Sequence, residues 1–389
     1  MWVELLLALL VEGFREFQEW WQTRVPWRTG AASSGQPALD DDGTVNRPGR
    51  NRSGEVQDCV EAVLDRHARK HVGIAVGVCW QDATWTFARG RVSAGRSEPP
   101  GADTIFEIGS ITKVFTAIVL ADMEQEGLVA LEDPAQRYLP KGVELPVRGR
   151  AITLLDLATQ TSGLPRLPKG LLWRSLRQRA NPYAGFTSDQ FEKAIGRTRL
   201  RRAPGEKLRY SNLGFGLLGY LLALRTGTSY EQLVLERICD PLELTDTRIS
   251  IPAEALPRFA DGHNRRGHPV PHWELPALAG AGALRSSVAD LLRFLQLQQQ
   301  EPTSRLGRAA RTTHEPRAHR GRLTQGLGWV SLPLRGHPHR VLWHNGGTGG
   351  FRSFIGFVKE TQTAVAVLSN CSRSVDAVGF RILEAINKL

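Results

Sequence analysis

The chain has 389 residues, 41% of them hydrophobic, and a formal net charge of +11. This length allows a large buried core in one or two domains, and no stretch reaches the roughly 18–20 apolar residues of a membrane-spanning helix. Two basic regions, 166–209 and 305–340, lack the aromatic interleaving of nucleic-acid readers. We therefore exclude nucleic acid as a partner and expect a solvated basic face or attraction to an anionic envelope polymer or lipid surface.

Residues 1–28 are predicted to be an apolar, amphipathic N-terminal segment whose glutamates fall near one helical face. The segment lacks the basic start and the small-residue cleavage site of a secretory signal. Three interpretations stay open: a helix in which residues 1–21 make peripheral contact with a membrane, a helix packed on the domain, and a mis-assigned start of translation.

Residues 29–54 contain almost no large apolar side chains, which predicts a disordered linker. From residue 55 the sequence has the period of an amphipathic helix, and the runs "VGIAVGVCW" and "TWTFARGRV" then predict an antiparallel hairpin. We place the start of the globular domain, 55–389, at this change and expect no catalytic residue before it.

Most periodic segments from Phe115 to about Leu297 are helical, which places an inserted lobe at about 105–320, and strands return near residue 325 before a final helix. Because the early hairpin has too few strands for an independent sheet, we expect it to join the late strands. The predicted fold is therefore α+β. An antiparallel sheet from about 55–104 and 325–389 is flanked by the N- and C-terminal helices, with a large helical lobe inserted. The cleft between lobe and sheet is the expected site.

The cysteines and histidines show no metal-binding spacing. The four cysteines are scattered without a CxxC pair, and we predict that they are small buried hydrophobic residues. His263, His268 and His272 share one loop, but its proline and glycine residues give no fixed face to aim them. We therefore expect no metal site.

Ser110 and Lys113 stand at the start of the helix predicted in "FEIGSITKVFTAIVL". A spacing of three residues puts them on one helical face, where a desolvated amine can take the proton of a serine hydroxyl. The positive end of the helix dipole also stabilises the negative charge that develops on the serine oxygen. A helix cap beside a solvated lysine is the alternative, because a Ser-x-x-Lys motif also occurs by chance.

The tripeptide "YSN", residues 210–212, precedes a second predicted helix. A tyrosine near ammonium groups can act as a general base and then return the proton as an acid. Ser211 relays a proton or caps the helix, and Asn212 binds a substrate carbonyl or holds Lys113. As an isolated tripeptide, the motif fits a helix cap better than a catalytic role.

The stretch "WHNGGTGGFRSFIGF" contains the third motif, His344, Asn345 and Gly346, at the end of a predicted strand. Its glycines allow the strand edge and the following turn to approach a ligand closely. Edge amides can then donate hydrogen bonds to that ligand. A flexible hairpin loop explains the same residues without any function.

The three motifs in this order resemble those of the serine β-lactamase and penicillin-binding protein superfamily. The tyrosine and the His-x-Gly pattern are similar to its class C β-lactamase, D-aminopeptidase and esterase branch. The resemblance covers roughly residues 55–389 and includes "LEDPAQRYLP", "ITLLDLATQTSGLPR" and "GALRSSVADLLRFL". It implies a β-lactamase-like fold, the one predicted above, and no metal or organic cofactor.

The resemblance also implies a role for each matching residue. Ser110 is the expected acylated nucleophile, Lys113 its activating partner, and Tyr210 the general base and later the acid. The backbone N–H groups of Ser110 and Gly347 are the expected oxyanion hole. The remaining expected substrate-binding residues are Asn212, His344, Asn345 and Gly346.

His344 departs from the family pattern, because β-lactamases have lysine at this position. With an ordinary pKa of roughly 6.5, a histidine is mostly neutral at about pH 7, so we expect esters, amides or peptides to be favoured over carboxylated β-lactams. The class A deacylation motif E-x-x-L-N is absent from the sequence, so Tyr210 must serve both half-reactions.

The sequence therefore predicts a serine hydrolase that acts on an ester, amide, peptide or β-lactam bond of a small-molecule or peptide substrate. The alternatives are a penicillin-binding-like protein that deacylates slowly and a non-catalytic scaffold that keeps the fold. The resemblance favours the cell envelope or periplasm slightly over the cytoplasm. The sequence determines neither the natural substrate nor the oligomeric state.

Overall fold

The computed structural model describes residues 52–168, 170–171 and 181–389. The predictions for residues 1–28 and for most of the linker lie outside the described residues. Helix α2, Arg52–His67, begins three residues before the expected domain boundary. Within the described ranges, no helix combines the length and the apolar character that crossing a membrane requires.

An antiparallel sheet joins the two ends of the domain, and its eight strands in the described part follow the order β2-β1-β12-β11-β10-β9-β8-β7. Strand β1 pairs with β12 from Ile74↔Ser369 to Trp80↔Thr363. This pairing confirms that the early hairpin joins the late strands. The strands are β1 Gly73–Trp80, β2 Ala83–Gly90, β7 Ala318–Arg320, β8 Leu323–Gln325, β9 Val330–Pro333, β10 Arg340–Gly347, β11 Arg352–Val358 and β12 Thr363–Ser369.

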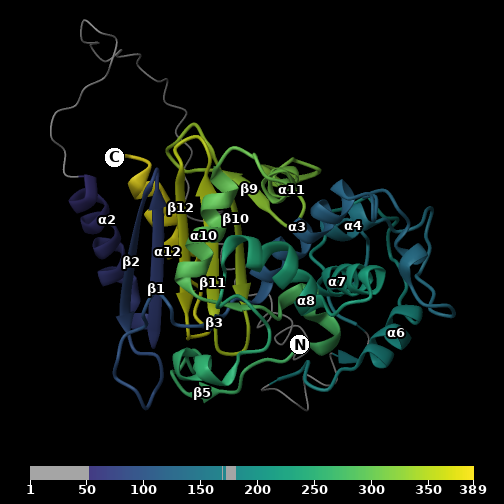
Figure 1. Cartoon of the computed structure of the whole chain (residues 1–389), viewed down its shortest axis with the longest axis horizontal. Helices are drawn as coiled ribbons and strands as arrows, with labels where there is room; N and C mark the ends of the chain where they lie inside the picture. The colour runs from purple at the N-terminus through teal and green to yellow at the C-terminus, as the bar shows by residue number, and fades with distance from the viewer. Residues whose placement is uncertain (1–51, 169, 172–180) are drawn as a thin grey trace, which may run out of the picture.

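Helices cover both faces of this sheet (Figure 1). Helix α2 and the last helix, α12 (Asp376–Ile386), pack on one face, and α10 (Val288–Gln299) packs on the other. Because side chains alternate along a strand, Ile74 and Val76 of β1 join the core under α2 and α12, whereas Ala75 joins the core facing the lobe. This double burial explains the continuous apolar run in β1.

The inserted lobe is mainly helical and lies beside the sheet (Figure 1). Its helices are α3 Thr112–Gln125, α4 Leu154–Ala158, α6 Ser188–Gly196, α7 Asn212–Thr226, α8 Tyr230–Val234, α9 Ala279–Gly282 and α11 Arg305–Thr313. The sequence analysis missed α11 and the hairpin β7–β8. Both are short, and arginine-rich or polar residues interrupt their apolar period.

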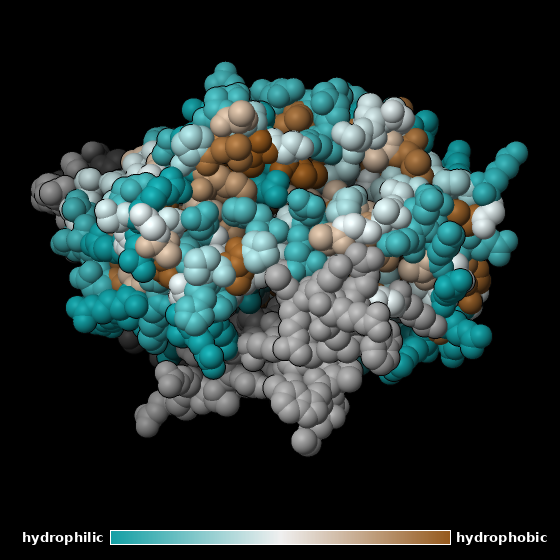
Figure 2. Space-filling view, turned by 90° about the horizontal axis from the view of Figure 1, so that it is seen from below, coloured by the Kyte–Doolittle hydropathy of each residue, from teal (hydrophilic) through white to brown (hydrophobic). Residues whose placement is uncertain are grey.

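Cys79, Cys239 and Cys371 are buried and Cys59 is half-buried, all with free thiols. Figure 2 shows that hydrophilic side chains cover most of the described part of the face seen from below. The apolar groups on that face form small separate patches, as is normal for a protein surface.

Candidate active site

Ser110 and Lys113 lie where the lobe meets the sheet. Ser110 is in the 3₁₀ turn Gly109–Ile111 that leads into α3, and Lys113 is fully buried in the first turn of α3. The Lys113 Nζ donates to the Ser110 Oγ at 3.0 Å and to the Ala281 carbonyl at 2.6 Å. Burial, together with the nearby charge of Arg166, lowers the pKa of Lys113 well below its usual value. The amine is therefore suited to accept a proton.

Tyr210 reaches the same serine from the other side. Its hydroxyl donates to the Ser110 Oγ at 2.7 Å. Gln160 fixes the backbone on both sides of Tyr210, because its carbonyl accepts from the Arg209 N–H and its side-chain Oε1 accepts from the Ser211 N–H, each at 2.7 Å. Gln160 adopts φ = 62°, a left-handed conformation that non-glycine residues seldom take. Sequence reasoning did not identify Gln160 as a positioning residue.

Ser211 and Asn212 have different roles in the geometry. The Ser211 Oγ accepts from the Gly214 N–H at 2.9 Å and donates to the Pro165 carbonyl at 2.7 Å. Of the two interpretations of Ser211, the structure thus favours the helix cap. The Asn212 Oδ1 is buried and accepts no hydrogen bond from any described residue. It lines the same cavity as Ser110, where a substrate N–H can reach it.

Arg166 adds a permanent positive charge to this cluster. Its guanidinium carbon lies 5.1 Å from the centroid of the Tyr210 ring, and the Lys113 Nζ lies 4.9 Å from that centroid. Burial raises the pKa of Tyr210 to about 12, although Arg166 and the hydrogen bond with Ser110 oppose the rise. The phenol is therefore protonated at neutral pH. The one sequence signal for Arg166 was its place directly after "SGLP".

His344 and Asn345 lie on β10, beside Tyr210. Burial and the charge of Lys113 lower the pKa of His344 to about 3, and its Nδ1 lies 2.6 Å from the Asn345 carbonyl oxygen. The imidazole is therefore neutral at physiological pH. The Asn345 side chain donates to the Asp376 carboxylate at 2.8 Å, which ties β10 to the start of α12.

Two glycine positions allow β10 to lie directly against the Ser110 turn. A Cβ on Gly346 would stand 1.9 Å from the Ile108 carbonyl oxygen. A Cβ on Gly109, which has φ = +50°, would stand 2.6 Å from the Gly347 nitrogen. The backbone at Ser110 and at Gly347 is thus brought to one edge of the cavity, as an oxyanion hole requires.

The cavity in front of Ser110 is narrow, and polar and apolar groups line it in similar measure. Its aromatic wall consists of Tyr183 and Trp273, whose ring centroids lie 5.0 Å apart. The lining residues are Gly109, Ser110, Tyr183, Asn212, Trp273, Leu275, Leu278, Ala281, Gly282, Gly347 and Thr348. Five of the eight predicted site residues, Ser110, Lys113, Tyr210, Asn212 and Gly347, thus either contact the serine or line its cavity.

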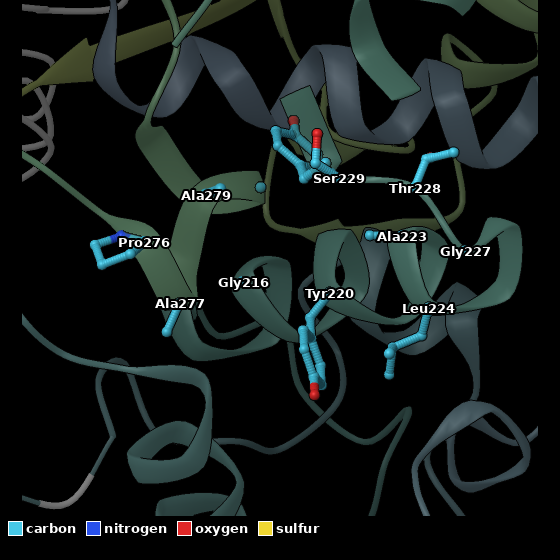
Figure 3. A pocket seen from close by; sticks show the side chains of 12 residues that line it. Gly216, Tyr220, Ala223, Leu224, Gly227, Thr228, Ser229, Pro276, Ala277 and Ala279 are labelled. Carbon is cyan, nitrogen blue, oxygen red and sulfur yellow. The ribbon is translucent and has the colours of Figure 1, made fainter. Parts of the chain in front are cut away.

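A second cavity lies between α7 and the segment 276–280 (Figure 3). Tyr220 and Leu224 of α7 line it together with Pro276 and Ala277, and none of the predicted site residues does. Its wall includes the first residues of α9, the helix whose Ala281 carbonyl accepts from Lys113.

Two histidines of the loop that contains His263, His268 and His272 contact other parts of the fold. The His263 Nδ1 lies 3.0 Å from the Asn370 carbonyl oxygen, and the His272 Nδ1 lies 3.2 Å from the Glu107 carboxylate. Across residues 52–168, 170–171 and 181–389, no three His, Cys, Asp or Glu side chains gather as a metal site would require.

A serine hydroxyl shared by a buried amine and a phenol, at the junction of an antiparallel sheet and a helical lobe, defines the serine β-lactamase and penicillin-binding protein class. A family model described as Beta-lactamase matches residues 56–385. The chain belongs to this family, and it is a hydrolase of the serine type.

Individual relatives are moderately similar. The D-alanyl-D-alanine-carboxypeptidase/endopeptidase AmpH of Escherichia coli K12 is 30% identical over 72% of this chain and 74% of its own. A β-lactamase of Pseudomonas fluorescens is 28% identical over 77% of this chain and 88% of its own. The crystal structure of D-alanine carboxypeptidase AmpC from Burkholderia cenocepacia has a TM-score of 0.72 at 26% identity and covers 87% of this chain and 99% of its own. The β-lactamase-like fold is therefore confirmed.

Proposed function

We propose that the protein hydrolyses an ester, amide, peptide or β-lactam bond through an acyl-Ser110 intermediate. The observation that carries the proposal is that the Ser110 Oγ contacts both the Lys113 Nζ, at 3.0 Å, and the Tyr210 hydroxyl, at 2.7 Å. The named activities of the relatives, carboxypeptidase and β-lactamase, are of the same general type.

In the acylation step, Lys113 is the proton acceptor and Tyr210 the proton donor. The low pKa of Lys113 favours its neutral amine, which takes the Ser110 proton as the Oγ–carbon bond forms. Because its pKa is about 12, Tyr210 still holds its proton and gives it to the leaving group as the scissile bond breaks. The step leaves an acyl-Ser110 ester, an ammonium on Lys113 and a phenolate on Tyr210.

In the deacylation step, the two groups exchange roles. The phenolate of Tyr210 takes a proton from water as the water oxygen bonds to the acyl carbon. The Ser110 oxygen then leaves and takes the proton from the Lys113 ammonium, which restores all three groups. Arg166, whose guanidinium carbon is 5.1 Å from the Tyr210 ring centroid, stabilises the phenolate between the two steps.

The dependence of deacylation on Tyr210 alone supports slow deacylation as the second candidate function. No carboxylate base matching the class A motif is present in the sequence, so water activation depends on one buried phenolate. A protein in which that step is slow would stay acylated, as a penicillin-binding protein does. The scaffold interpretation has less support, because it assigns no role to the buried Lys113 amine beside the serine.

Covalent labelling tests the proposal. Full-length protein incubated with a fluorescent fluorophosphonate or penicillin should become labelled, and Ser110→Ala should abolish the label. Ser97→Ala, which changes an exposed serine outside the site, is the matched control and should be labelled like the wild type. Labelling that persists in Ser110→Ala, or a folded wild type that no acyl or phosphonyl probe labels, would refute the acyl-Ser110 mechanism. Following the loss of the penicillin label, which is an acyl ester on Ser110, then separates hydrolysis from slow deacylation.

A further inference from the structure

A groove with two compartments begins beside Tyr210. The inner compartment contacts the site, because Tyr210, His344 and Asn345 line it. Leu208 and Arg320 line both the inner and the outer compartment. The two compartments therefore adjoin each other at these two residues, and Tyr210 lines only the inner one.

The walls of this groove come from two segments that run beside each other. On one side, residues 205–208 line the outer compartment, and Leu208 and Tyr210 line the inner one. On the other side, residues 317–320 line the outer compartment, and Arg320, Leu323 and Gln325 line the inner one. The hairpin β7–β8 thus forms the far wall of the groove.

The outer compartment has a volume of about 360 Å³, which lies in the range of small-molecule sites of about 300–1,000 Å³. Lys207 and Arg320 make no ion pair or side-chain hydrogen bond with any residue in the described part of the chain. The charged lining residues are the permanent cations Arg150, Lys207, Arg317 and Arg320 and the carboxylates Asp156 and Glu206.

The other two arginines are already neutralised. Asp156 holds Arg150 with hydrogen bonds of 2.6 and 2.7 Å, and Glu315 holds Arg317 at 2.6 Å. Arg320 is also the only permanently charged residue among those that line the inner compartment. Lys207 and Arg320 are therefore the two cations that can attract a ligand from solution.

The chemistry at Ser110 decides which part of a substrate enters the groove. The leaving group must lie next to Tyr210, because Tyr210 gives it a proton, and the groove begins at Tyr210. The acyl group stays on Ser110 in the narrow cavity lined by Asn212 and Tyr183. This assignment rests on the proposed function.

We propose that the groove binds the leaving group of the substrate and that this group carries an anion, a carboxylate or phosphate, at its distal end. Lys207 and Arg320 bind that anion in the outer compartment. Arg166 lies against the Tyr210 ring but lines neither compartment, so the unpaired cations that face the groove are Lys207 and Arg320. The substrate is accordingly an ester or amide with a small acyl group and a long anionic leaving group.

A series of acetate esters tests this inference on the full-length protein. All esters share the acyl group, while the leaving alcohol carries a carboxylate, a phosphate or a neutral hydroxyl on spacers of increasing length. In the wild type we expect kcat/KM to be about tenfold higher for the anionic esters than for the neutral ester, once the spacer reaches the outer compartment. Comparison of the carboxylate and phosphate arms identifies which anion is preferred.

The variants give the sharper readout. Arg320→Ala and Lys207→Ala should each reduce the anionic-to-neutral ratio of kcat/KM about five- to tenfold, and Arg320→Glu should invert it. The effect should be confined to acylation, because the leaving group has departed before water attacks. Arg69→Ala, which removes an exposed arginine far from the groove, is the matched control and should keep the wild-type ratio.

Binding of the free anionic alcohol to Ser110→Ala, measured by calorimetry, gives a readout without turnover. We expect binding that Arg320→Ala weakens about tenfold. An acylated wild type with equal kcat/KM for anionic and neutral esters at every spacer length would overturn this inference and leave the proposed function standing. A protein that is never acylated would overturn the proposed function, and absence of alcohol binding would then overturn this inference as well.

Discussion

Removing the charge of Arg166 should change both the rate and the pH dependence of acylation. Arg166 lies 5.1 Å from the centroid of the Tyr210 ring, and its charge lowers the pKa of both Tyr210 and Lys113. At roughly 5–7 Å and an effective dielectric constant of about 20, an ion pair contributes about 2–3 kcal/mol. Because Arg166 is half-buried and solvent screens part of its charge, we use the lower value of about 2 kcal/mol for its stabilisation of the Tyr210 phenolate. This corresponds to a roughly 30-fold change in rate.

The direction of the pH shift follows from Lys113. Its amine accepts a proton only when neutral, so kcat/KM is lost as the pH falls through the pKa of Lys113. Arg166→Ala removes a positive charge that lowers this pKa. The pKa therefore rises, and the acidic limb of the profile should move to higher pH, together with a drop in kcat/KM of up to roughly 30-fold.

The assay is a pH profile of kcat/KM for p-nitrophenyl acetate. Arg166→Lys should keep part of the rate and of the pH position, because it keeps the charge. Arg209→Ala, an exposed arginine beside Tyr210 in the sequence, is the matched control and should keep the wild-type profile. An Arg166→Ala variant with an unmoved acidic limb and kcat/KM within twofold of the wild type would refute this account of Arg166.

Three further changes test the site and the stability of the fold. His344→Lys should raise kcat/KM for nitrocefin relative to p-nitrophenyl acetate about tenfold, since it adds a permanent positive charge that attracts the nitrocefin carboxylate. A wild type that already strongly prefers nitrocefin would contradict this account of His344. Burial lowers the pKa of His71 to about 4 and of His314 and His344 to about 3. The unfolded chain thus binds more protons below pH 6.5, and the free energy of unfolding should fall by up to about 1.4 kcal/mol per pH unit and histidine as the pH drops toward 4. Urea unfolding at pH 7 and 5 should show a smaller loss in His314→Gln, and an equal loss would be contrary evidence. Gly346→Ala places a Cβ 1.9 Å from a carbonyl oxygen and should cost about 1–3 kcal/mol and reduce Ser110 labelling. Gly95→Ala, whose nearest atom is 4.0 Å away, serves as control; a Gly346→Ala protein with the wild-type melting temperature would count against this reasoning.

Local sequence patterns predicted the parts of the fold that depend on local burial. The apolar run of β1 predicted a strand of an antiparallel hairpin, and the shortage of strands in that hairpin predicted its pairing with the late strands. The hairpin β7–β8 was not predicted, because its strands have three residues each and are held by neighbouring strands rather than by their own period. This hairpin forms one wall of the groove that we propose for the leaving group.

The candidate site was predictable where spacing alone brings residues together. Three residues on one helical turn place Ser110 beside Lys113, whereas the contact of Tyr210 with Ser110 spans 100 positions and came only from the family resemblance. Arg166 and Gln160 carry no motif of their own. Their roles depend on where the chain places a charge and a left-handed turn, which periodicity does not encode.

In this site the permanent charge beside Tyr210 comes from Arg166 and not from His344. β-Lactamases have lysine at the position of His344, and here that residue is neutral while Arg166 lies against the Tyr210 ring. If the two positions supply the same charge to the same phenolate, they must be coupled. For p-nitrophenyl acetate, His344→Lys should then recover at least about fivefold of the kcat/KM lost in Arg166→Ala, although it changes the kcat/KM of the wild type for this substrate much less. Equal effects of His344→Lys in both backgrounds would mean that Arg166 acts on Tyr210 through packing and not through charge.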